Sequence, residues 1–251
     1  MFWKLIRWLL PLTLIAGLIA SNALTFSYAY QYYVALNSTR LDPLGLSTYA
    51  SEPSEQVEAD QQTAVFLGDS RAVQWPSPQH ESIQFLNRGI GAQTTAQVLH
   101  RHPAHVSPLK ADFVIIQVGI NDLKTLRLFP NSQEQIIHQT KENITQLAAL
   151  AATDGSQVIL TSVIPVRDVR PRRRPFWSPR TETAVVEVNQ HLAQLAQQEG
   201  YLLLDAATLL AGENGRLQRQ FATDELHLNA RGYERLNKAL IELLENQIEE
   251  E

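Results

Sequence analysis

The stretch AVFLGDSRAVQW, residues 64–75, decides how the rest of the sequence is interpreted. It begins as a short apolar run, which predicts a buried strand, and it ends abruptly in Gly68-Asp69-Ser70. Glycine, aspartate and serine are the commonest turn residues, so a plain turn is one interpretation. The other is that Ser70 is a nucleophile at the end of a strand. That role requires a base, a group that orients the base and donors for an oxyanion.

Apolar runs of this kind recur along the chain and alternate with helical patterns. Five runs are expected strands: 63–68, 82–87, 111–119, 156–165 and 200–206. Four segments with apolar residues at helical spacing are expected helices: 91–102, 131–153, 180–200 and 229–248. Long apolar runs suit a parallel sheet covered on both faces, and strand–helix alternation predicts a layered α/β domain.

The composition excludes several classes of protein. A hydrophobic fraction of 44% and a charged fraction of 19% are globular values, so wholesale disorder is not expected. The net charge of −5 shows no basic bias, so we expect no nucleic-acid partner. The absence of cysteine excludes disulfides, thiol catalysis and cysteine-ligated zinc. No pair of histidines has a convincing metal-ligand context, and we expect no metal or organic cofactor.

The N-terminus predicts a membrane segment. Lys4 and Arg7 precede a long stretch, residues 8–39, that contains no charged residue. About 20 apolar residues span the hydrocarbon of a bilayer. We expect residues 1–36 to form a transmembrane anchor. The alternative is a cleaved signal peptide, for which residues 21–23 (Ser-Asn-Ala) are a small-x-small site.

Both membrane interpretations place the remaining chain outside the cytoplasm, because the basic residues should stay on the cytoplasmic side. The protein is then either membrane-anchored with an extracytoplasmic domain or exported after signal cleavage. Residues 37–62 are polar and without a sustained period, so they are expected to be a linker. Residues 63–251 are long enough for one ordinary domain with a single core.

Polar residues that follow the apolar runs are candidates for a site, because ligands bind at the carboxyl ends of parallel strands. Ser70 follows the first run, Gly91 the second and Asn121 the third. A side-chain amide such as that of Asn121 can donate to an oxyanion, although asparagine is also common in turns and helix caps. His227 is the candidate base, because Asp224 three residues earlier can accept its Nδ1 proton and leave Nε2 free.

The set of motifs resembles the SGNH (GDSL-type) hydrolase family over about residues 63–245. FLGDS is similar to the family's first block, VGIND to its Gly-x-Asn-Asp block and DELHLNARGY to its Asp-x-x-His block, and the order is the same. The resemblance implies a three-layer, flavodoxin-like α/β fold with a five-stranded parallel sheet. It also implies Ser70 as nucleophile, Asn121 as oxyanion donor, and Asp224 with His227 as the remaining catalytic residues.

Two positions depart from the family pattern. Arg71 follows the serine where leucine is usual. In NRGIGAQTT, Ala92 occupies the place of the oxyanion-hole glycine and Gln93 that of an aspartate. The backbone N–H of Ser70 is one expected donor to the oxyanion. The N–H of Ala92 can be another provided that its φ is negative, because alanine is strained at positive φ. Gly91 fills the role if the register slips by one residue.

The segment VRDVRPRRRPFWSPR, residues 166–180, carries six arginines and follows the fourth expected strand. One interpretation is a rim in which Arg172, Arg173, Arg174 and Trp177 bind an anionic substrate or lipid headgroups. The other is a solvated basic loop.

The expected function is ester hydrolysis through an acyl-enzyme on Ser70, with a small-molecule, lipid or glycan ester as substrate. The chain lacks the G-x-S-x-G elbow of ordinary α/β-hydrolases. Two alternatives remain open. One is an O-acetyltransferase that acts on cell-envelope glycans, and the other is a non-catalytic surface binding protein on the same scaffold.

Overall fold

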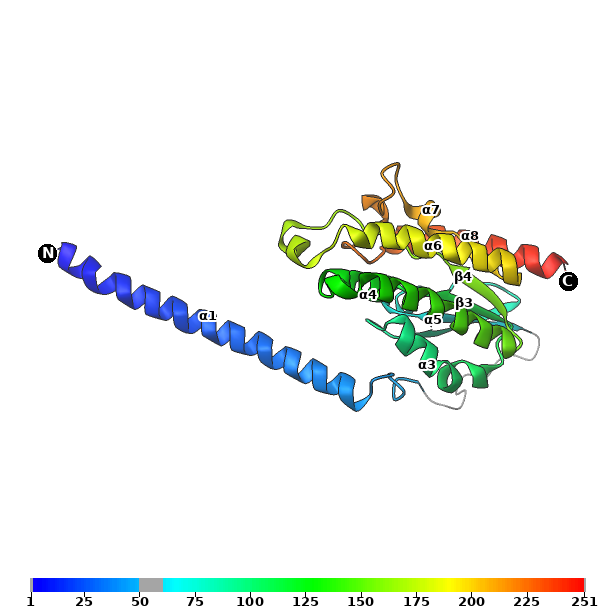
Figure 1. Ribbon diagram of the computed structural model, residues 1–251, viewed down its shortest axis with the longest axis horizontal. Coiled ribbons are helices and arrows are strands. Elements are labelled where there is room, and N and C mark those ends of the chain that lie inside the picture. The colour runs from blue at the N-terminus through cyan, green and yellow to red at the C-terminus, as the bar shows by residue number, and fades with distance from the viewer. Residues whose placement is uncertain (1, 50–60, 251) are drawn as a thin grey trace. The chain divides into compact units, whose positions relative to one another are not determined.

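The computed structural model describes residues 2–49 and 61–250, so part of the expected linker, residues 50–60, lies outside the described residues. The chain divides into two compact units, Met1–Gly45 and Leu46–Glu251. The first is almost entirely one helix, and the second holds the sheet (Figure 1).

The helix of the first unit, α1 (Phe2–Leu41), is forty residues long. Its stretch Pro11–Leu41 is long and apolar enough to cross a membrane, and a signal sequence meets the same criterion. At 1.5 Å per residue, α1 measures about 60 Å, roughly twice the thickness of the bilayer hydrocarbon. The helix continues past residue 36 into the stretch expected to be the linker.

The second unit is built on a parallel five-stranded sheet with the strand order β2-β1-β3-β4-β5. The strands are β1 (Gln62–Gly68), β2 (Ile83–Gly89), β3 (Phe113–Gln117), β4 (Gln157–Thr161) and β5 (Leu202–Leu204). This is the flavodoxin-like order, in which the direction of winding reverses between β1 and β3. The predicted fold class is therefore confirmed, and so are all five strands.

The four expected helices are present as α3, α5, α6 and α8, and three short helices join them. Their bounds are α2 (Ser70–Val73), α3 (Thr95–His105), α4 (Ile120–Leu123), α5 (Gln133–Thr153), α6 (Arg180–Glu199), α7 (Ala206–Leu210) and α8 (Ala230–Glu250). The 3-10 helices are η1 (Ser107–Leu109), η2 (Lys124–Arg127), η3 (Pro130–Ser132), η4 (Pro171–Phe176) and η5 (Arg219–Phe221). Helices α2, α4 and α7 were not predicted, because a helix of about one turn shows no measurable hydrophobic periodicity.

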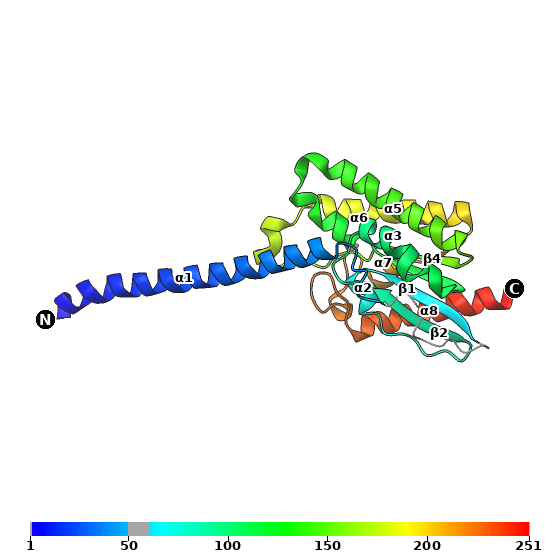
Figure 2. The same cartoon turned by 90° about the horizontal axis from the view of Figure 1, so that it is seen from below.

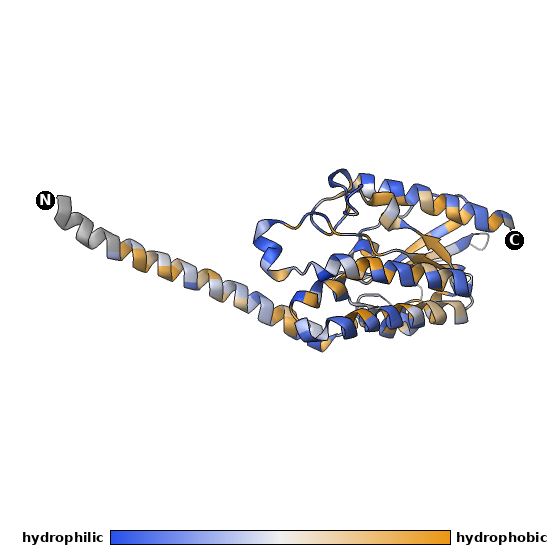
Figure 3. Ribbon diagram, turned by 45° about the horizontal axis from the view of Figure 1, so that its top comes forward, coloured by the Kyte–Doolittle hydropathy of each residue, from blue (hydrophilic) through white to orange (hydrophobic). Residues whose placement is uncertain are grey.

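The helices cover both faces of the sheet and divide the core in two. Helices α3, α5 and α6 pack on one face, against side chains such as Val65 and Ile116. Helices α7 and α8 pack on the other face, against Phe66 and Ile115. Figure 2 shows the sheet between these two layers, and Figure 3 shows mostly apolar strands flanked by helices with one polar face. Burial of both faces explains why the strands are continuous apolar runs.

The carboxyl end of β2 lies against the short helix α2. A Cβ atom at Gly89 would lie 2.3 Å from the backbone nitrogen of Val73, so only glycine fits there. Next to it, Asn87 Nδ2 donates to the carbonyl of Ala72 at 2.8 Å. The end of β2 therefore fixes the position of α2 and of Ser70 at its start.

This close approach yields a stability prediction. The substitution Gly89→Ala should lower the free energy of unfolding by about 3 kcal/mol, because the added methyl group meets backbone that cannot move aside. For a domain of this size that corresponds to a fall in Tm of about 6–12 °C, measurable by circular dichroism. Gly91→Ala is the control, because a Cβ at Gly91 meets nothing within 4 Å. Equal melting temperatures for the two variants would contradict the contact.

Candidate active site

The candidate site lies at the carboxyl ends of β1 and β3, the two strands between which the winding direction reverses. Ser70 begins α2 directly after β1, and Asn121 lies in α4 directly after β3. Asp224 and His227 come from the loop between η5 and α8. Open α/β sheets place their ligand sites at such a point.

The structure brings Ser70, His227 and Asp224 into one hydrogen-bonded line. Ser70 Oγ lies 3.0 Å from His227 Nε2, and His227 Nδ1 lies 2.9 Å from Asp224 Oδ2. Ser70 is partly exposed, so a substrate can reach its hydroxyl group. The residues predicted as nucleophile, base and orienting carboxylate are thus within hydrogen-bond distance of one another, as those roles require.

Asp224 is held as a carboxylate. Burial raises its pKa, but the hydrogen bond from the His227 ring and those from the backbone N–H groups of Leu226 and His227 outweigh burial and bring the pKa to about 2. These N–H groups donate to Asp224 Oδ1 at 2.7 and 2.8 Å, which leaves Oδ2 for the imidazole. A fixed negative charge at Nδ1 favours the tautomer in which Nε2 is the base.

The Asn121 amide is buried and its orientation is fixed at both ends. Its Nδ2 donates to the carbonyl of Gln93 at 2.9 Å, and its Oδ1 accepts from Lys124 Nζ at 2.6 Å. An amide nitrogen carries two hydrogens, and the bond to Gln93 uses one of them. Burial lowers the pKa of Lys124, although nearby Asp69 opposes the shift.

The glycine-rich turn after β2 differs from expectation at Ala92. Its φ is 64°, in the left-handed region, whereas the sequence argument for an alanine donor required a negative φ. Alanine therefore adopts a conformation that usually belongs to glycine, at a cost of about 1–2 kcal/mol. The strain lies next to Gln93, whose side chain accepts from buried Arg101 at 2.5 Å and whose carbonyl holds Asn121. The turn is thus held in place by contacts at the residue that follows it.

A buried acid, Asp69, and a half-buried one, Asp122, shape the site. Asp69 is the N-cap of α2 and accepts from the N–H of Arg71 at 2.9 Å; burial raises its pKa. Asp122 accepts from the N–H and the hydroxyl of Thr95, at 2.9 and 2.8 Å, and burial raises its pKa to about 6. Asp69 thus fixes the start of α2, whereas Asp122 joins α4 to the start of α3.

Two residues to which the sequence motifs assign no role position the His227 loop. The buried Arg71 donates from Nε to the carbonyl of Leu226 at 2.9 Å and from Nη1 to that of Ile164 at 2.8 Å. Glu225, also buried, forms ion pairs with Arg170 at 3.1 Å and with another arginine of the same loop. The one sequence feature that could have pointed to these residues is their position, since Arg71 follows Ser70 and Glu225 follows Asp224.

The arginine-rich segment separates into residues with different surroundings. Arg172, Arg173 and Arg174 are all exposed, and Arg173 Nη1 lies 3.5 Å from Glu225 Oε2. Trp177 is half-buried and packs against the core cluster under α5 and α6. Of the predicted substrate-binding set, Arg173 and Trp177 therefore hold the segment to the domain.

Two hollows lie near these elements. One, of about 390 Å³, adjoins the Asn121 turn and is lined by Thr94, Asp122, Thr125, Phe129, Ile136 and neighbouring polar residues. Another, of about 820 Å³, is lined by residues of the segments 167–168 and 212–220, none of which is a candidate catalytic residue.

Residues 59–235 match the sequence model of the GDSL-like lipase/acylhydrolase family. The match covers most of the chain and includes every candidate catalytic residue. The chain therefore belongs to this family of hydrolases, as the sequence motifs predicted.

The fold is shared with solved structures of the family. A GDSL-like lipase from Bacteroides thetaiotaomicron is 23% identical, with 81% of this chain and 98% of that chain covered and a TM-score of 0.68. A lipase/acylhydrolase from Enterococcus faecalis is 20% identical, with 74% and 97% covered and a TM-score of 0.57. At these identities the likeness establishes the fold. No curated protein matches the chain significantly.

The strain at Ala92 yields a prediction. Ala92→Gly should raise the free energy of unfolding by about 1 kcal/mol, because glycine adopts positive φ without the steric cost. Chemical denaturation measures the change. Ala92→Val is the opposite control and should be less stable than the wild type, because β-branched residues are outliers in this region. A destabilised glycine variant would contradict the left-handed backbone at this position.

Proposed function

We propose that the protein is a serine esterase that cleaves a carboxylic ester through an acyl-enzyme on Ser70. The observation that carries the proposal is the hydrogen-bonded line from Ser70 Oγ through His227 to Asp224, at 3.0 and 2.9 Å. Membership of a hydrolase family supports it.

The proposed reaction has two half-reactions. Ser70 Oγ attacks the ester carbonyl carbon while its proton passes to His227 Nε2. The tetrahedral intermediate then expels the alcohol, which takes that proton from His227 as it leaves. Water, deprotonated by the same nitrogen, attacks the acyl-enzyme and releases the acid, and the proton returns to Ser70. Asp224 stabilises the imidazolium in both halves and fixes its orientation.

The proposed oxyanion hole combines backbone and side-chain donors. Ser70 is the first residue of α2, so its backbone N–H has no partner within that helix. The N–H of Gly91 is the second donor, because the argument for Ala92 required a negative φ and its φ is 64°. The remaining hydrogen of the Asn121 amide is the third donor. The ammonium group of Lys124, 2.6 Å from Asn121 Oδ1, polarises the amide toward the oxyanion.

The surroundings of the site indicate an ester of modest size. The hollow of about 390 Å³ beside Asn121 is large enough for a short acyl group. The ammonium group of Lys124, 2.6 Å from Asn121 Oδ1, places a cation beside the site. We propose that Arg173, with Arg172, Arg174 and Trp177 on the same segment, favours a substrate with an anionic group.

We further propose that α1 is retained as an anchor, so that the domain acts outside the cytoplasm. The apolar stretch is longer than the 7–15-residue apolar region typical of signal peptides. The basic residues Lys4 and Arg7 would remain cytoplasmic.

The first prediction tests the nucleophile. The full-length chain in detergent should react covalently with a fluorophosphonate probe and hydrolyse p-nitrophenyl acetate, because His227 activates Ser70. Both activities should be lost in Ser70→Ala. An unlabelled, folded wild type would favour the non-catalytic binding protein. Labelling with transfer of acetyl groups to a glycan, in preference to water, would favour the O-acetyltransferase.

The second prediction tests the oxyanion donor. Asn121→Ala should lower kcat by about 10²–10³, because the lost hydrogen bond is formed fully only in the transition state. Steady-state kinetics with the same ester measures the change, and KM should move little. Asn214→Ala, an exposed asparagine in the loop after α7, is the control. A near-normal rate for Asn121→Ala would remove this residue from the hole.

A further inference from the structure

Two loops at the carboxyl edge of the sheet expose large apolar side chains. Leu128 and Phe129, after η2, are 60% and 54% exposed, and Phe176, at the end of η4, is 66% exposed. Within the described part of Leu46–Glu251, Phe176 and Leu128 are the most exposed of the large apolar side chains. Single exposed apolar residues are ordinary on a protein surface. A group of them beside a candidate site indicates an interaction surface.

The two loops are joined and form one surface. Arg127 Nε, next to Leu128, donates to the carbonyl of Pro175, next to Phe176, at 3.2 Å. Leu128, Phe129 and Phe176, together with the arginines Arg127, Arg172 and Arg174, are called the basic rim below.

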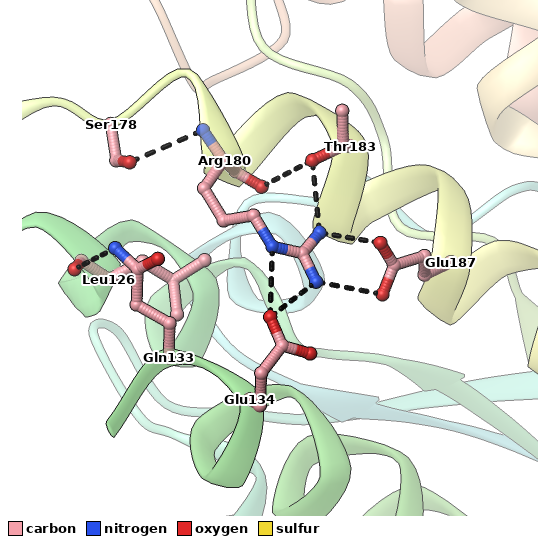
Figure 4. Close-up of polar contacts among 7 residues, drawn as sticks. All are labelled: Leu126, Gln133, Glu134, Ser178, Arg180, Thr183 and Glu187. Carbon is pink, nitrogen blue, oxygen red and sulfur yellow. Dashed lines mark hydrogen bonds and ion pairs between the residues drawn. The ribbon is translucent and has the colours of Figure 1, made fainter. Parts of the chain in front are cut away.

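The base of the rim is fixed to the domain (Figure 4). Arg180 at the start of α6 forms ion pairs with Glu134 at 2.9 Å and with Glu187 at 2.5 Å. Gln133 Nε2, at the start of α5, donates to the carbonyl of Leu126 at 2.9 Å. The side chains of the rim are therefore presented by loops that are anchored on both α5 and α6.

The charge of the rim is positive and uncompensated. Arg127, Arg172 and Arg174 are exposed, and none of them forms an ion pair with any carboxylate of residues 61–250 that the structure describes. Arg173 and Arg180, on the same segment, are paired with Glu225 and with Glu134 and Glu187. The chain as a whole is acidic, with a net charge of −5, so the positive rim is a local feature.

We propose that the basic rim docks on the surface of a bilayer that contains anionic lipids. Leucine and phenylalanine gain by entering the boundary of the hydrocarbon, and arginine beside them binds lipid phosphates in two-pronged hydrogen bonds. A soluble anion would satisfy the arginines and leave the apolar side chains in water. The same chain contains a candidate membrane span, which would hold the domain close to a bilayer. The proposal does not depend on the chemistry of Ser70.

The absence of cysteine makes a site-specific probe simple. Phe176→Cys in the full-length chain is labelled with a polarity-sensitive fluorophore and reconstituted into vesicles of phosphatidylcholine, with or without phosphatidylglycerol. The expected result is a blue-shifted and several-fold brighter emission in the anionic vesicles, quenched by spin-labelled lipid. Leu150→Cys is the matched control. It is 38% exposed near the far end of α5, about 25 Å along the helix from its start, and its emission should not change.

The charge requirement is tested in the same labelled protein. Arg172→Gln with Arg174→Gln should abolish the response. Lys110→Gln with Lys238→Gln, which removes two exposed cations elsewhere, should preserve it. All of these positions are exposed, and unchanged melting temperatures verify the fold. Equal emission in both kinds of vesicle, or a response that survives loss of the two arginines, would overturn the proposal. So would an equal response to soluble dextran sulfate added to phosphatidylcholine vesicles.

Discussion

His227 lies in a loop without regular structure, so its position opposite Ser70 depends on buried charged groups that hold this loop. The guanidinium group of Arg71 donates to the carbonyl groups of Leu226 and Ile164, and so joins α2, which begins at Ser70, to the His227 loop and to the segment after β4. From the other side, the buried carboxylate of Glu225 binds arginines of the basic segment. Removal of the Arg71 guanidinium would leave the carbonyl groups of Leu226 and Ile164 without this donor, which is more costly than the loss of a surface ion pair.

Buried polar groups and one of the two described non-glycine residues at positive φ lie at this edge of the sheet. Asp69, the residue before Ser70, is fully buried, and burial lowers the pKa of Arg101 to about 10 where a neutral Gln93 is its side-chain partner. Ala92 adopts a left-handed backbone. In the rest of the domain, the apolar faces of the strands and helices are the faces that pack in the core. Departures from local consistency are expected where a site must hold groups in a set geometry.

The arginines of the segment have two kinds of surroundings because its helix has three residues per turn. Arg170 and Arg173 are one turn of η4 apart, lie on the same side and both bind Glu225. Arg172 and Arg174 fall on other sides and remain exposed. The sequence argument treated Arg172, Arg173 and Arg174 as one binding set, since composition does not distinguish arginines within a run. Only their positions along η4 separate Arg173, which pairs with Glu225, from Arg172 and Arg174.

The amino-acid sequence by itself determined the five strands and the four long helices, because hydrophobic periodicity is a local property of the chain. It also predicted the order of the Ser70, Asn121 and Asp224–His227 motifs, whose catalytic roles stay predictions. The tertiary structure decided what depends on the path of loops. Arg71 meets Leu226 across 155 positions, Lys124 orients the Asn121 amide, and Ala92 takes a positive φ. No local pattern specifies such contacts, because they arise only when the carboxyl ends of β1, β3 and β4 and the loop before α8 meet at one edge of the sheet.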